Sequence, residues 1–249
     1  MPDLVLAAGG AWPLAWCVSV LFAAYALRGA TGFGAGVVAI PLLLFVLPLP
    51  VVIPLVTATG MLASLGQSVR EFRRVNWAGI RRLVVPTLAG VALGLWLFTA
   101  LDAQLLLKAC AGFIIGYALW SLGPARAPRA PGGWLAALAG ALGGLVATLF
   151  GGMAGPFYVV YLNALELDKA RFRATVSVVL FLLAAVRMTG YGGLGLYDAR
   201  VLALLAVSLP VMVVAMLAGD HWHRRLDEAR FRRVVSALMA LSGLALLFK

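Results

Sequence analysis

The chain has 249 residues, of which 63% are hydrophobic and only 12% are charged, and its mean hydropathy is +1.02. A soluble globular protein cannot hide so much apolar surface, so the composition excludes that class and indicates a protein that lies in lipid. The formal net charge of +11 would suggest a nucleic-acid partner in a soluble protein. In a membrane protein, Lys and Arg instead mark cytoplasmic loops, so no nucleic-acid partner is predicted.

Ten apolar segments follow one another along the chain and predict an all-α polytopic membrane protein. Their expected ranges are 12–28, 35–48, 51–69, 79–99, 104–122, 134–150, 153–163, 169–189, 199–219 and 229–248. Crossing the hydrocarbon of a bilayer takes about 20 helical residues. The segments 35–48 and 153–163 are short for a crossing, and they occupy the same place in each half of the chain.

A glycine-rich stretch precedes or opens each short segment. These stretches, Gly29 to Gly36 and Gly151 to Pro156, interrupt apolar sequence. Glycine permits unwound backbone, and the free amides at a helix N-terminus attract anions with the help of the helix dipole. Pro41 and Pro156 are expected to limit continuation of the helices. The two breaks therefore predict an anion site.

A weak internal repeat divides the chain near its middle. A Pro/Gly linker at 123–133 separates a first membrane repeat, 1–122, from a second, 134–249. Arginines concentrate near 70–82, in the linker and near 224–233, which predicts that these three regions are cytoplasmic. On that assignment the repeats have inverted topology, each with a broken helix or hairpin followed by three transmembrane helices. Whether 12–48 and 134–163 are re-entrant hairpins or full crossings stays open.

Three cations lie inside apolar segments and away from the basic loops, namely Arg28, Lys108 and Arg187. A charge within the hydrocarbon is costly and is treated as functional unless it reaches the interface. Arg28 either snorkels to the headgroups or binds an anion, and its neighbouring glycine break favours the anion site. Arg187 binds substrate or serves as an interfacial anchor. Lys108 is expected to snorkel.

None of the nine carboxylates lies in the middle of an apolar segment, which disfavours a metal-cation carrier or a carboxylate proton relay. Cys17 and Cys110 have no metal-ligand spacing, and His221 and His223 have no carboxylate or cysteine oriented with them, so a polar cytoplasmic interface is expected there. No metal and no cofactor are therefore predicted. A membrane enzyme would need a buried nucleophile with its base, or paired aspartates, so the chain is not expected to be an enzyme.

Neutral polar residues beside the breaks complete the predicted site. Thr57 and Thr59 in the first half correspond to Thr175 and Ser177 in the second. The expected substrate-binding residues are Arg28, Gly29, Thr31, Gly32, Gly34, Gly36, Pro41, Thr59, Gly151, Gly152, Gly155, Pro156, Ser177 and Arg187. The pairs Gly90/Gly94, Gly112/Gly116 and Gly140/Gly144 have the spacing of close helix contacts and are assigned to packing alone.

The stretches Gly29-Ala-Thr-Gly-Phe-Gly-Ala-Gly and Ile40-Pro-Leu-Leu, with Gly151-Gly-Met-Ala-Gly-Pro156 in the second half, resemble the sulfite exporter TauE/SafE family of permeases. The resemblance covers essentially the whole chain. It implies transport of small sulfur-containing anions such as sulfite, sulfonates or sulfoacetate across the bacterial inner membrane. The second break differs from the first because its proline directly follows the last glycine.

The sequence thus predicts a secondary transporter for a small anion, working by alternating access around a site near the bilayer midplane. Its partners would be the anion, membrane lipid and a coupling ion, H⁺ or Na⁺, if transport is coupled. A homo-oligomer, the direction of transport and the exact substrate stay open. The alternatives are a non-transporting membrane scaffold and a carrier of another small organic anion.

Overall fold

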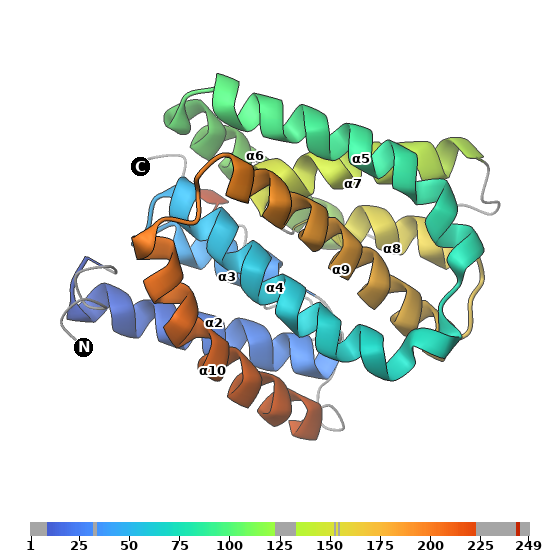
Figure 1. Ribbon diagram of the computed structural model, residues 1–249, viewed down its shortest axis with the longest axis horizontal. Coiled ribbons are helices and arrows are strands. Elements are labelled where there is room, and N and C mark those ends of the chain that lie inside the picture. The colour runs from blue at the N-terminus through green and yellow to red at the C-terminus, as the bar shows by residue number, and fades with distance from the viewer. Residues whose placement is uncertain are drawn as a thin grey trace. The chain divides into compact units, whose positions relative to one another are not determined.

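The structure is a computed structural model that describes residues 9–31, 34–122, 133–151, 153, 155–222 and 243–244. The regular elements of these residues are all helical, which confirms the predicted fold class (Figure 1). They are α2 (Ala11–Thr31), α3 (Ala35–Leu43), α4 (Leu49–Glu71), the 3₁₀-helix η1 (Phe72–Arg74), α5 (Trp77–Ala100), α6 (Ala103–Leu122), α7 (Gly133–Phe150), α8 (Gly155–Asn163), α9 (Lys169–Gly193) and α10 (Ala199–Trp222).

Six helices of the described residues are long and apolar enough to cross a membrane. These spans are Ala11–Ala30, Leu49–Gly66, Trp77–Ala100, Gly133–Phe150, Ala170–Gly193 and Ala199–His221, and α6 adds a shorter apolar helix at Ala103–Leu119. Large apolar side chains point outward from them, with Val85 74% exposed, Trp96 63% and Leu217 64%. Such a surface suits contact with lipid, and the expectation of a multi-pass membrane protein is confirmed.

The two short segments form short helices, as predicted. α3 and α8 have nine residues each, far fewer than a crossing requires. The last predicted segment, 229–248, lies outside the described residues except for Gly243 and Leu244, and so does the linker except for Gly133.

The chain forms two compact units, each composed of segments far apart in the sequence. Unit 1 comprises residues 1–55, 101–125 and 197–249, and unit 2 comprises 56–100 and 126–196. Unit 1 therefore contains α2, α3, α6 and α10, while unit 2 contains α5, α7, α8, α9 and most of α4. Each unit contains segments from both predicted repeats. The inverted topology of the repeats stays a prediction.

The main contact of unit 1 is between α2 and α10, which lie side by side (Figure 1). It depends on one glycine from each helix. A Cβ at Gly29 would overlap the carbonyl oxygen of Met216, and a Cβ at Gly219 would overlap that of Ala26. Backbones this close leave no room for any side chain, so both positions require glycine.

Unit 2 repeats this kind of contact between α5 and α7, which also lie side by side (Figure 1). A Cβ at Gly90 would overlap the carbonyl oxygen of Ala141, and one at Gly144 would overlap that of Thr87. Gly94 and Gly140 face the partner helix in the same way. The structure thus agrees with the packing role predicted for two of the three glycine pairs.

The third pair, Gly112 and Gly116 of α6, is different. Both residues are exposed, and among the described residues no atom lies within 4 Å of a Cβ added at either position. The opposite face of α6 is the packed one, with Cys110, Ala111 and Ile114 fully buried. The spacing of glycines therefore does not by itself identify a helix contact within the chain.

Candidate functional site

The first break is narrower than predicted. α2 continues through Gly29 to Thr31, and α3 already begins at Ala35, so the expected unwound stretch from Gly29 to Gly36 is mostly helical. The cause is the contact with α10, since Gly29 is needed there as a helical packing residue. Gly34 has the non-helical backbone expected of the break: its φ of +92° suits glycine, and its carbonyl accepts the first bond of α3 from Val37 at 3.1 Å.

Pro41 lies inside α3 and is buried, and the helix ends two residues later at Leu43. The indole Nε1 of Trp16 in α2 donates to the carbonyl of Leu42 at 2.9 Å. This bond satisfies a carbonyl that has no partner within the last turn of the helix. α3 is thus fixed to α2 on the far side of the break.

Arg28 lies in the last turn of α2 and is only 6% exposed. A snorkelling arginine would expose its guanidinium, so the burial argues against the interfacial alternative. Of the neighbouring predicted residues, Thr31 ends α2, Gly36 lies in the first turn of α3, and Gly32 is outside the described residues. The substrate role of Arg28 stays a prediction.

The second break separates α7, which ends at Phe150, from α8, which begins at Gly155. Gly151 has a φ of +64°, which turns the chain out of α7, whereas Gly152 is outside the described residues. Pro156 is the second residue of α8, where a missing N–H costs nothing because the first turn has no acceptor for it.

Two buried tyrosines attach α8 to α5. The Tyr158 and Thr87 hydroxyls lie 3.2 Å apart, and the Tyr161 hydroxyl donates to the carbonyl of Gly79 at 3.2 Å. Tyr158 packs so closely on α7 that a Cβ at Gly143 would come within 2.7 Å of its ring. The short helix after the break is therefore held by polar bonds as well as by packing.

Arg187 of α9 forms the centre of a polar cluster in unit 2. It is 2% exposed, and one terminal nitrogen donates to Thr57 Oγ1 of α4 at 2.6 Å and to the Tyr191 hydroxyl at 3.3 Å. The Tyr191 hydroxyl in turn donates to the carbonyl of Thr148 at 2.5 Å. Thr148 lies in the last turn of α7, where carbonyls lack helical partners. The cluster thus joins α4 and α9 to the helix end that opens the second break.

The Arg187 guanidinium is not fully used by these bonds. Its Nε is buried and has no hydrogen-bond partner in the part of the chain that the structure describes. The ring of Tyr191 lies 5.5 Å from its central carbon, a cation–π distance. A buried cation with an unsatisfied N–H is costly, and an oxyanion accepting that N–H would remove the cost.

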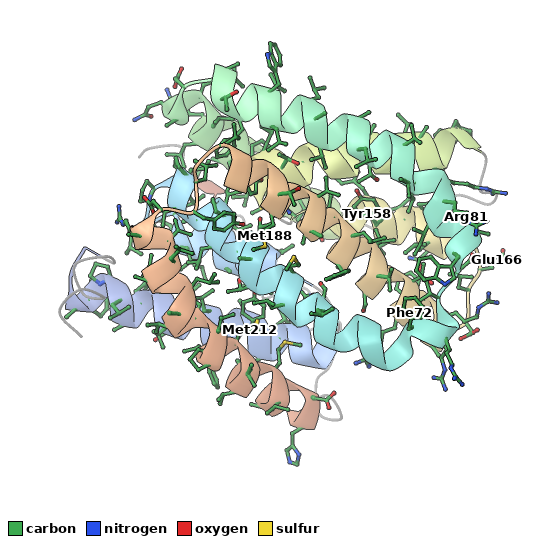
Figure 2. The ribbon with its side chains drawn as sticks, viewed as in Figure 1. Phe72, Arg81, Tyr158, Glu166, Met188 and Met212 are labelled. Carbon is green, nitrogen blue, oxygen red and sulfur yellow. The ribbon has the colours of Figure 1, made fainter. Side chains whose placement is uncertain are left out.

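The carboxylates of unit 2 lie too far away to neutralise Arg187. Glu166 and Asp168 precede α9, so they lie roughly 27 Å from Arg187 along that helix. Glu71 ends α4, roughly 21 Å beyond Thr57. Figure 2 shows the same separation, with Phe72, Arg81 and Glu166 gathered at one end and Met188, which follows Arg187, well away from them. The cluster is therefore positive and lacks a protein counter-ion among the described residues of unit 2.

Ser177 also carries an unsatisfied group. It is 1% exposed, and its Oγ has no hydrogen-bond partner within the described ranges. Its predicted counterpart Thr59 is fully buried and donates to the carbonyl of Val56 at 3.3 Å, a local bond within α4. Ser177 and Arg187 both belong to α9 and lie roughly 15 Å apart along it, so one helix carries both buried groups that have no hydrogen-bond partner among the described residues.

Replacing Ser177 by Ala is expected to raise the unfolding temperature and to reduce anion flux. Leaving a buried hydroxyl unsatisfied costs about 1–3 kcal/mol, and the replacement removes that cost. A reduced flux in a more stable protein would identify the hydroxyl as a substrate contact. Thermal unfolding in detergent and flux in proteoliposomes measure the two effects, with Ser208→Ala as control because that hydroxyl already donates to Leu204. Unchanged flux in Ser177→Ala would remove Ser177 from the site.

The sequence indicated Arg187 and, separately, Thr57 as a polar group of the site, but it did not pair the two and did not indicate Tyr191 or Thr148. Tyr191 follows Arg187 by one helical turn, a spacing that places two side chains on one face, and this signal could have identified it. Thr57 and Thr148 belong to α4 and α7, and no local pattern connects either of them to α9. The burial of Arg187 argues against the alternative of an interfacial anchor, and its substrate role stays a prediction.

Known proteins that this chain resembles are membrane transporters. A family model described as sulfite exporter TauE/SafE matches residues 17–246. The probable inner membrane transporter protein TsaS of Comamonas testosteroni is 29% identical over 71% of this chain and 74% of its own length. The probable sulfite/organosulfonate exporter TauE of Cupriavidus necator is 24% identical over 94% of both chains. No solved structure matches. These relatives are transporters, not enzymes, which confirms the expected protein class.

Proposed function

Because the chain belongs to the sulfite exporter TauE/SafE family, we propose that it transports small sulfur-containing anions, such as sulfite or organosulfonates, across the bacterial inner membrane. The names of the two relatives support this substrate class and location. The membrane-spanning character of the helices is compatible with it.

The observation that carries the proposal is the buried Arg187 with its free Nε. A guanidinium offers five N–H donors in a planar fork that matches two oxygens of a sulfo group. Thr57 and Tyr191 already hold one nitrogen in place, so the fork is oriented before the anion arrives. Orientation in advance lowers the entropy lost on binding.

The mechanism follows from the place of this cluster. The anion would accept hydrogen bonds from Arg187, whose cluster reaches the end of α7 that opens the second break. Arg28 and the first break would supply a corresponding set in unit 1. Alternating access would then expose the bound anion to one side of the membrane at a time. Coupling to H⁺ or Na⁺ and assembly into a homo-oligomer are compatible with this mechanism.

The proposal is tested by flux of radiolabelled sulfite into proteoliposomes that contain the purified wild-type protein. We expect saturable flux that a sulfonate inhibits in competition. Arg28→Met, assayed in parallel, is expected to lower this flux through the loss of the anion contact in unit 1. Absence of flux for sulfite, sulfonates and other small organic anions, in protein shown to be folded, would contradict the proposal and favour a membrane scaffold.

A further inference from the structure

We infer that the Arg187 cluster selects singly charged anions, so that the protein binds hydrogensulfite and sulfonates and rejects the sulfite and sulfate dianions. The inference rests on the proposed function, because it assumes that Arg187 holds the anion. It goes further by stating the charge that the site accepts. Hydrogensulfite and sulfite exchange a proton near neutral pH, so the two charge states of one substrate can be compared directly.

The Arg187 cluster carries a single positive charge. Arg187 is the one buried cation among the described residues of unit 2. Arg171 and Arg173 lie in the first turns of α9, roughly 20–25 Å away along the helix. A monoanion at Arg187 would form a neutral pair, whereas a dianion would leave one unit of negative charge uncompensated. Removing net charge from water is far more costly than removing a neutral pair, since the Born energy grows with the square of the charge.

The side chains that contact the Arg187 guanidinium are uncharged. Thr57 and Tyr191 are neutral hydroxyls, and the Thr57 oxygen and the Tyr191 oxygen both accept from Arg187. The Tyr191 proton is engaged with the Thr148 carbonyl, so this hydroxyl has no second donor for an anion. The immediate surroundings therefore add little positive potential with which to hold a second negative charge.

Titration of the protein itself adds no second charge near Arg187. Among the described residues of unit 2, the titratable groups that face Arg187 are two phenols, Tyr191 on its own helix and Tyr158 on α8, and Thr57 on α4 does not titrate. A phenol ordinarily remains neutral below about pH 10. The charge of the cluster is therefore constant across the range in which hydrogensulfite loses its proton. Any change in sulfite affinity across that pH range is therefore caused by the change in charge of the ligand.

The test measures binding to the wild-type protein in detergent, where no pH gradient exists, at slightly acidic and slightly alkaline pH. The ligands are sulfite, methanesulfonate and sulfate. Methanesulfonate keeps one negative charge and sulfate keeps two across this range. We expect the dissociation constant of total sulfite to rise by about tenfold for each pH unit above its second ionisation. Methanesulfonate should bind equally at both values, and sulfate should not compete.

Sulfite affinity that stays constant or increases as the pH rises, or effective competition by sulfate, would overturn the inference while leaving the proposed function intact. Failure of every anion to bind to folded protein would instead overturn the proposed function. Arg187→Lys provides a second check, because it keeps the charge but loses the fork. Its affinities should be weaker with the same preference for single charge, and a loss of that preference would contradict the charge argument.

Discussion

Replacing Arg187 by Met is expected to reduce anion flux by roughly 10–100-fold. A hydrogen bond to a charged group contributes about 1.5–3 kcal/mol, and the substitution removes at least one such bond to the bound anion. The unfolding temperature should change by no more than about 4 °C, because a buried cation without a counter-ion adds little to stability and Met fills most of the volume. Flux and thermal unfolding of the same preparation give both quantities.

The matched control is Lys108→Met, which removes a cation from an exposed position of α6 and should leave flux unchanged. Arg187→Lys should retain part of the flux, since it preserves the charge. Full flux in Arg187→Met would exclude the cluster from transport. A large fall in unfolding temperature with no folded protein recovered would assign Arg187 to folding.

The second large effect is expected at the contact between α5 and α7. Gly144→Ala would drive a methyl group into the Thr87 carbonyl and to 3.0 Å from the Val91 nitrogen. Neither atom can move without displacing the α5 backbone. Overpacking of this kind costs about 1–3 kcal/mol, so the unfolding temperature should fall by about 2–10 °C. Thermal unfolding in detergent, followed by circular dichroism, measures the change.

Gly112→Ala and Gly116→Ala are the controls, because their added methyl groups would meet nothing within 4 Å. All three substitutions replace glycine by alanine inside a helix, so they share the same gain in helix propensity, about 1 kcal/mol. The difference between Gly144→Ala and the α6 variants therefore isolates packing. Equal stabilities of the three variants would show that the α5–α7 contact is looser than described.

Hydropathy and glycine position were sufficient to predict most of the helices that the structure describes. The expected segment 79–99 became α5 (Trp77–Ala100), and 153–163 became α8 (Gly155–Asn163). Apolar length and helix-breaking residues are local properties, and they decide where a helix begins and ends in lipid. The predicted end of α2 was wrong because Gly29 remains helical and packs against the backbone of Met216. No local sequence pattern reveals this contact.

The candidate site was only partly predictable for the same reason. The charge of Arg187 is evident in the sequence, but its burial and its bond to Thr57 depend on how α4 meets α9. The three Gly-xxx-Gly pairs are alike in sequence, yet within the described residues two of them face another backbone and the third does not. Spacing within one helix shows which residues share a face. Which other helix packs against that face depends on the fold of the whole chain.

The composition of unit 1 also sets the order in which the protein can be completed during synthesis. α2 is made among the first residues, but its close partner α10 follows roughly 190 residues later, which is on the order of ten seconds or more at about 5–20 residues per second. During that interval the glycine face at Gly29 has no α10 backbone to contact. Insertion of α2 must therefore be separate from its final packing, and a ribosome that stops before residue 199 leaves unit 1 without its central helix pair.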